Sequence, residues 1–128
     1  MSLDLKITIP GHCISANALY KHNRSGGIYL SDDAKAYRAM AKSHVEKAMK
    51  TGGTYGGGEV VVRVESFDNY YTKAGLIRDV DIDNSVKNLL DSIFPVLGVR
   101  DKVVFDLHVK KKQFVGDPKC VIVIKERA

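Results

Sequence analysis

Length, composition and charge describe one ordinary globular domain. The chain has 128 residues, of which 45% are hydrophobic and 27% are charged, and its formal net charge is +5. These values exclude an intrinsically disordered chain, and no apolar run is long enough to span a bilayer. Because no signal-peptide pattern is present either, we expect a single cytoplasmic domain over residues 1–128 without a membrane partner.

The first part of the chain predicts a strand followed by a basic hairpin. Polar and apolar residues alternate over residues 4–9, and Pro10-Gly11 ends the strand. The basic turn 21–27 lies between two segments that can pair as a small hairpin. Its Lys21 and Arg24 either line a solvated tip or bind phosphate, and the residues themselves favour neither interpretation. The two cysteines, Cys13 and Cys120, suit a reducing compartment and indicate neither a disulfide framework nor a zinc site.

A long amphipathic helix is predicted after Ser31. Ser31 is a favourable N-cap, apolar residues then recur at helical spacing, and Gly52 is a candidate C-terminal cap. The glycine-rich residues 51–58 predict a flexible connection and residues 59–67 a strand. Residues 68–77 are polar and irregular in pattern, so we expect a plain connection there.

Residues 78–87, with the sequence Arg-Asp-Val-Asp-Ile-Asp-Asn-Ser-Val-Lys, hold the most informative pattern. Asp79, Asp81 and Asp83 would leave an extended chain on the same side, because side chains alternate along a strand. Carboxylates about 6–7 Å apart repel by about 2–3 kcal/mol at an effective dielectric constant of about 20. Solvent or a bound cation relieves that repulsion. The stretch is therefore either a solvated turn in which Asp83 caps a helix, or a cation site.

Helical spacing begins directly after this stretch. Apolar residues from Val86 onward predict a helix over residues 83–94, and Pro95 allows at most a distorted last turn to Leu97. Its other face carries Asp83, Lys87 and Asp91 at i, i+4 and i+8, which is either an ion-pair ladder or part of a site.

Beyond the helix, Asp101 stands in a short turn before a strand, where it can return toward the earlier carboxylates. That strand covers residues 105–109 and continues into Lys110 to Lys112, which either protect a sheet edge or contact phosphate. A turn at 116–118 and a strand at 120–124 complete the chain.

The order of elements predicts an α+β fold, in which two main helices cover one face of a mixed sheet in a single two-layer domain. Carboxylates among cations suit metal-assisted cleavage of a phosphodiester, since Mg²⁺ prefers oxygen ligands. A calcium-binding loop fits poorly, because Asn84 and Leu90 stand where that loop needs Gly and Glu. A non-catalytic nucleic-acid-binding module explains the basic residues, but it leaves an acidic cluster that would repel DNA unexplained.

The sequence resembles the RusA family of Holliday junction resolvases over most of its length. Ile9-Pro10 followed by Ser15-x-Asn17-x-x-Tyr20 is similar to the family's opening loop, and residues 21–24 and 31–38 are similar to its basic hairpin and first helix. The strongest match is Asp81-Ile82-Asp83-Asn84-x-x-Lys87 with Asp91, followed by Asp101 before Val103-Val104. Cys13-Ile14 stands where the family carries a proline pair.

This resemblance implies an Mg²⁺- or Mn²⁺-dependent endodeoxyribonuclease that resolves four-way DNA junctions by paired cleavage in recombination and repair. It also implies a homodimer in the cytoplasm of a bacterium or of a phage-infected cell. Asp81, Asp83 and Asp101 are the implied metal ligands, and Lys87 is the implied catalytic lysine. Contacts to DNA are predicted from a wider polar set, namely Lys21, Arg24, Arg78, Asn84, Lys110 and Lys112.

Overall fold

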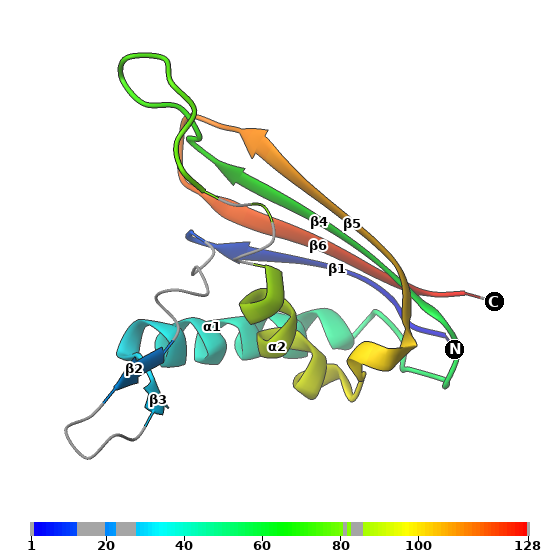
Figure 1. Ribbon diagram of the computed structural model, residues 1–128. Coiled ribbons are helices and arrows are strands. Elements are labelled where there is room, and N and C mark those ends of the chain that lie inside the picture. The colour runs from blue at the N-terminus through cyan, green and yellow to red at the C-terminus, as the bar shows by residue number, and fades with distance from the viewer. Residues whose placement is uncertain (1, 13–19, 23–27, 81, 83–85, 128) are drawn as a thin grey trace.

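A four-stranded mixed sheet forms one layer of the protein in the computed structural model (Figure 1). The structure describes residues 2–12, 20–22, 28–80, 82 and 86–127, with only the backbone of 20–22 and 29–30. The spatial order of the strands is β1 (Asp4–Pro10), β6 (Lys119–Glu126), β4 (Val60–Asp68) and β5 (Val104–Gln113). Strand β6 is antiparallel to both of its neighbours, whereas β4 and β5 are parallel.

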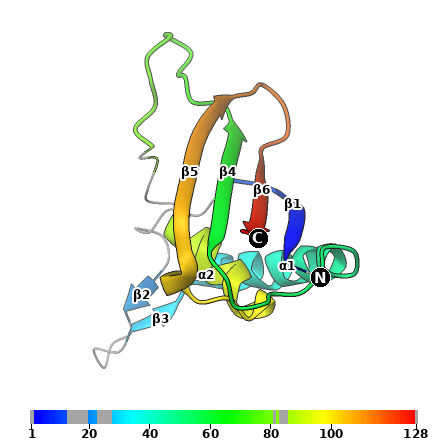
Figure 2. The ribbon, with the colours of Figure 1, turned by 90° about the vertical axis from the view of Figure 1, so that its right-hand side faces the viewer.

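Two helices, α1 (Asp32–Met49) and α2 (Val86–Leu97), form the second layer and cover one face of this sheet (Figures 1 and 2). Alternation within the strands decides which side chains meet the helices, and every second residue of β1 is buried. The core between the layers is apolar and includes Ile7, Ile9, Val45, Val62, Leu89, Ile93, Ile122 and Ile124. The mixed sheet and its two helices confirm the predicted α+β fold.

Helix α1 begins as its sequence predicts but ends differently. The Ser31 side chain accepts a hydrogen bond from the Ala34 N–H at 3.1 Å, which confirms the predicted N-cap. The C-cap is Lys50 and not Gly52. Gly52 instead permits a close approach to β1, because a Cβ atom there would lie 2.6 Å from the Cβ of Leu5. Its carbonyl accepts the Asp4 N–H at 2.8 Å, so the glycine joins the end of the helix to the first strand.

Helix α2 continues through Pro95 to Leu97, further than the regular helix predicted from the sequence. Pro95 lies on an exposed face, so its cost to the helix is a lost hydrogen bond and a ring crowding the preceding turn, not a gap in the core. The helix then closes with the Val99 N–H donating to the Phe94 carbonyl at 3.1 Å. The predicted N-cap, Asp83, lies outside the described residues.

A small two-stranded sheet, β2 (Tyr20–His22) and β3 (Ile28–Leu30), confirms the predicted hairpin before α1. Cys120 is buried in β6 and disulfide-bonded, so the prediction of two reduced cysteines is wrong for Cys120, while Cys13 lies outside the described residues. No helix in the described part of the chain is long and apolar enough to cross a membrane.

Candidate active site

An open pocket of about 290 Å³ lies between α2, β5 and the short 3-10 helix η2 (Asp101–Val103). Apolar side chains form most of its wall, and three charged side chains enter it. The lining residues are Ile82, Val86, Lys87, Leu90, Asp91, Asp101, Leu107 and Val109. The fold therefore brings Lys87 and Asp91 of α2 into one pocket with Asp101, which follows the helix in sequence.

Two of the charged groups are one helical turn apart on α2. Leu89 and Ile93 are fully buried and fix the opposite face of the helix against the core. Lys87 and Asp91 are consequently directed outward, and the Lys87 Nζ lies 3.6 Å from an Asp91 carboxylate oxygen. The Lys87 side chain is 73% exposed, so this ion pair contributes only a few tenths of a kcal/mol to stability. Lys87 therefore remains available to a bound ligand.

Asp101 reaches the pocket because the chain turns sharply after α2. Gly98 adopts a positive φ of 72°, and Val99 is buried, so the connection is held against the core before η2 begins. The exposed Asp101 carboxylate makes no hydrogen bond or ion pair within the described part of the chain. An unpaired carboxylate beside a lysine and a second carboxylate is suited to binding a cation or a polar ligand.

The other predicted metal ligands, Asp81 and Asp83, lie outside the described residues, as does Asn84. Ile82, which stands between the two aspartates in sequence, lines the pocket and is 45% exposed. Among the described residues alone, no three His, Cys, Asp or Glu side chains are grouped as metal ligands. The structure thus brings together Lys87, Asp91 and Asp101, and a complete metal site needs carboxylates beyond these.

The lysines at the end of β5 do not act as one group. Lys111 points toward the helix layer, where its Nζ donates to the Val80 carbonyl at 2.8 Å. Lys110 lines a separate hollow on the other face of the sheet. Lys112 alternates with Lys111 and pairs with Glu65 at 3.3 Å. Lys110 and Lys112 therefore project away from the pocket that holds Lys87.

The remaining predicted DNA-binding residues are partly described. Arg78 is exposed, and its Nη1 donates to the Asn69 carbonyl at 2.7 Å. The side chain of Lys21 and the whole of Arg24 lie outside the described residues.

Comparison with known protein families decides the classification. The family model described as "Endodeoxyribonuclease RusA" matches residues 10–125. The chain belongs to the RusA family. This confirms the resemblance, and it implies an endonuclease of the Holliday junction-resolving type. A comparison with curated proteins finds no match.

The RusA match includes the acidic stretch, α2 and Asp101, so the pocket lies within the part of the chain that defines the family. Its apolar wall was not predicted as part of a site. The alternation of Leu107 and Val109 with polar neighbours was the available signal, but it indicates only a strand face. Whether the side of β5 that carries Leu107 and Val109 lies toward α2 depends on how β5 pairs with β4.

A second feature missed by sequence reasoning is the segment after β4. Residues 69–80 form an arm that projects beyond the end of the sheet (Figures 1 and 2). Tyr71 and Ile77 pair across it as an antiparallel bridge, and Gly75 turns the chain with a φ of 81°. The sequence signal was the placement of aromatic and aliphatic pairs on either side of that glycine.

Proposed function

We propose that the chain is a divalent-metal-dependent endodeoxyribonuclease that resolves four-way DNA junctions by paired cuts in recombination and repair. The observation that carries this proposal is the pocket, in which Asp101 joins Lys87 and Asp91 beside Ile82 of the acidic stretch. The RusA classification supports the same activity.

Asp81, Asp83 and Asp101 would hold Mg²⁺ or Mn²⁺, since carboxylate oxygens are the ligands that these hard cations prefer. The donor chemistry fits the described part of the pocket, where Asp101 has no competing partner. When bound, the metal supplies charge neutralisation at the scissile phosphate and a water of lowered pKa.

The side chain of Lys87 would stabilise negative charge on the reacting phosphate. Its ammonium is exposed at the pocket, and a cation placed where charge develops lowers the barrier more than it strengthens ground-state binding. Asp91 lies 3.6 Å from the ammonium group on the same face of α2, and this exposed pairing is too weak to withhold Lys87 from a bound phosphate.

Binding to DNA would depend on phosphate contacts from Lys21, Arg24, Arg78 and Asn84. Lys110 and Lys112 would add contacts only where the DNA extends past the pocket to the other face of the sheet. Each phosphate neutralised on duplex DNA adds about −0.9 to the slope of log affinity against log salt. We therefore expect junction affinity to fall steeply with salt, as measured by fluorescence anisotropy. An affinity independent of salt would exclude this mode of binding.

A twofold dimer would supply two equivalent cleavage sites for the two symmetric cuts. Light scattering at micromolar concentration tests this directly. A monomeric mass combined with paired cleavage of one junction would contradict the dimer.

The proposed activity is tested by titrating Mg²⁺ into the protein with a labelled four-way junction. Asp101→Asn removes one charge with little change in shape, and we expect cleavage to fall by at least about 100-fold, because metal polarisation contributes several kcal/mol. Metal-free junction binding should persist or tighten, since one negative charge facing phosphate is gone. Asp79→Asn is the matched control in the acidic stretch and should retain most activity. Binding without cleavage at any Mg²⁺ concentration would favour the non-catalytic module.

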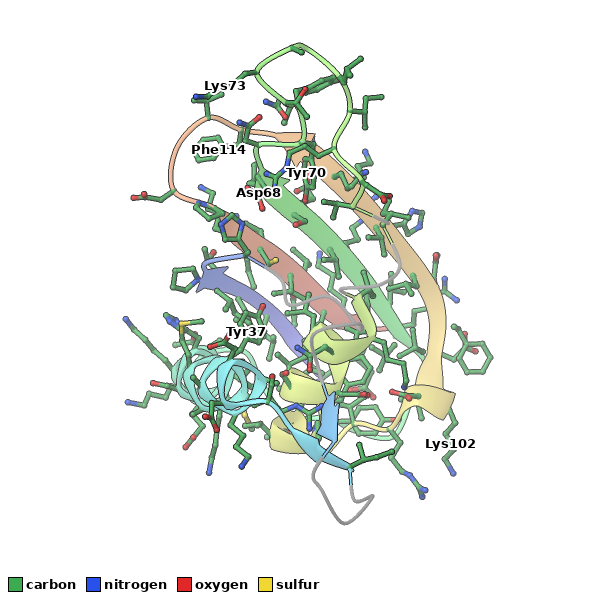
Figure 3. All side chains as sticks on the ribbon, turned by 60° about the vertical axis from the view of Figure 1, so that its left-hand side comes forward. Tyr37, Asp68, Tyr70, Lys73, Lys102 and Phe114 are labelled. Atoms are coloured by element: carbon green, nitrogen blue, oxygen red, sulfur yellow. The ribbon has the colours of Figure 1, made fainter. Side chains whose placement is uncertain are left out.

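Lys87→Ala tests the lysine by the same assay. We expect cleavage to be abolished while junction affinity weakens only slightly. Lys102→Ala is the matched control, because Lys102 is an exposed lysine next to Asp101 that does not line the pocket (Figure 3). Equal losses in the two variants would show that general positive charge, and not the position of Lys87, matters.

A further inference from the structure

The arm of residues 69–80 is an ordered hairpin, although its sequence resembles a plain connection. The Thr72 N–H donates to the Leu76 carbonyl at 2.7 Å, and the Leu76 N–H donates to the Thr72 hydroxyl at 3.1 Å. The Arg78 N–H donates to the Tyr70 carbonyl at 2.8 Å. These bonds close the two sides of the arm on each other, so its tip is held in one shape.

Side chains from the end of β5 brace the base of the arm. Gln113 accepts the Tyr70 N–H at 2.7 Å and donates to the Asn69 side chain at 2.9 Å. Lys111 donates to the Val80 carbonyl, and its ammonium lies 5.1 Å from the centre of the Tyr70 ring. Figure 3 shows Tyr70 at this base, while Lys73 extends from the far part of the arm. The arm therefore projects from the sheet at a fixed place.

The tip of the arm exposes large apolar side chains that contact no core. Tyr71, Leu76 and Ile77 are 45%, 67% and 71% exposed. Lys73 lies among them in sequence, and Arg78 and the exposed Asp79 follow. An apolar patch on a rigid, cationic support usually marks an interaction surface, because leaving such side chains in water has a free-energy cost. With two cations against one carboxylate, the charge of the arm favours a polyanion as the partner.

DNA offers apolar side chains a surface only where bases leave the stack. Intact duplex presents phosphates outward, whereas unstacked steps accept apolar side chains such as Leu and Ile. Unpaired or unstacked bases also pack on aromatic side chains such as Tyr. The arm leads through Val80, at its base, toward the acidic stretch whose Ile82 lines the pocket, so the base of the arm adjoins the candidate site in sequence. A second copy of the chain is a weaker candidate, since three side chains bury far less than the roughly 800 Å² per partner of a stable interface.

We propose that Tyr71, Leu76 and Ile77 pack against unstacked bases at the branch point of the junction, with Lys73 on a neighbouring phosphate. This inference rests on the proposed function and adds to it a contact that recognises branched DNA. Linear duplex gains only the phosphate contact. The arm therefore contributes to structure selectivity and not to cleavage chemistry.

The test uses a four-way junction with 2-aminopurine at the branch point, bound in EDTA so that no cleavage occurs. We expect the full-length wild-type protein to raise the 2-aminopurine fluorescence, because that base becomes less stacked. The double variant Leu76→Ser, Ile77→Ser should lose most of this increase and bind the junction at least about tenfold more weakly. Its affinity for linear duplex should stay within twofold of wild type. Val115→Ser is the matched control, since Val115 is an apolar residue 85% exposed in the turn before β6.

Several outcomes separate this inference from the proposed function. A wild-type protein that cleaves junctions, together with a double variant of unchanged fluorescence and affinity, would overturn the role of the arm alone. A wild-type protein that neither binds nor cleaves junctions would overturn both. A double variant that turns a dimer into a monomer by light scattering would assign the tip to a second copy and refute the DNA contact. Tyr71→Ser provides an independent variant of the same tip should the double variant fold poorly.

Discussion

Tyr37 allows a stability prediction in which the pKa and the packing can be tested separately. This α1 residue is 6% exposed, and within the described part of the protein its hydroxyl has no hydrogen-bond partner. Burial raises the pKa of Tyr37 to about 12, because the phenolate would lose its hydration. Figure 3 shows Tyr37 on α1, where it joins the core cluster between the layers. The perturbation that we consider is Tyr37→Phe.

The expected magnitude follows from the two pKa values. In the unfolded chain tyrosine ionises with a pKa of about 10, so between pH 10 and 12 it loses its proton more readily unfolded than folded. The wild-type protein is thus fully stabilised below pH 10 and loses stability as pH rises toward 12. The loss attributable to Tyr37 is about 1.4 kcal/mol at pH 11 and about 2.7 kcal/mol above pH 12. Phenylalanine has no proton to lose, so Tyr37→Phe removes this component.

Urea unfolding followed by circular dichroism at pH 8 and pH 11 measures the effect. Titrations of the lysines occur in both proteins and cancel in the difference. At pH 8 the variant should be as stable as wild type or slightly more stable, since an unpaired buried hydroxyl costs about 1–3 kcal/mol. Tyr55→Phe is the control, because the Tyr55 hydroxyl donates to the Gly58 carbonyl at 2.9 Å and its loss should destabilise by about 1 kcal/mol. A difference between Tyr37→Phe and wild type that does not change with pH would refute the reasoning.

Three further predictions concern other parts of the chain. Hydrogen bonds from the Gly56 and Gly58 N–H groups lower the pKa of Glu126. The wild-type protein should therefore lose stability as pH falls below about 4.3, and thermal melts of Glu126→Gln should lack that acid-dependent loss. Gly52→Ala should lower the melting temperature, because its Cβ would meet Leu5, and an unchanged melt would show that β1 can shift. Asp91→Asn should change the melting temperature by less than about 2 °C, because the exposed pair with Lys87 stabilises little, and a larger shift would assign it a structural role.

Patterns within short segments were sufficient for the main helices and strands and for the family. The alternation in β1, the N-cap at Ser31 and the helical spacing from Val86 all depend on neighbours in sequence, and each is present in the structure. The conformational preference of a single residue was a poor guide where tertiary packing opposed it. Pro95 disfavours a helix by losing one hydrogen bond, but buried contacts of residues such as Phe94 and Leu97 keep the last turn helical.

Only the tertiary structure decided which distant groups meet. Asp101 enters the pocket that Lys87 lines, because the turn after α2 and the parallel pairing of β5 with β4 place η2 there. Lys111 and Lys112 are adjacent in sequence, yet their side chains lie on opposite faces of the sheet, one bound to the Val80 carbonyl and the other paired with Glu65. The pairing of the edge strand β5 sets which face each side chain takes. The arm at 69–80 is ordered by bonds to Gln113 and Lys111, which lie more than thirty residues later in the chain. A sequence pattern reports the preferences of near neighbours, whereas contacts at such separations form only when the whole sheet has assembled.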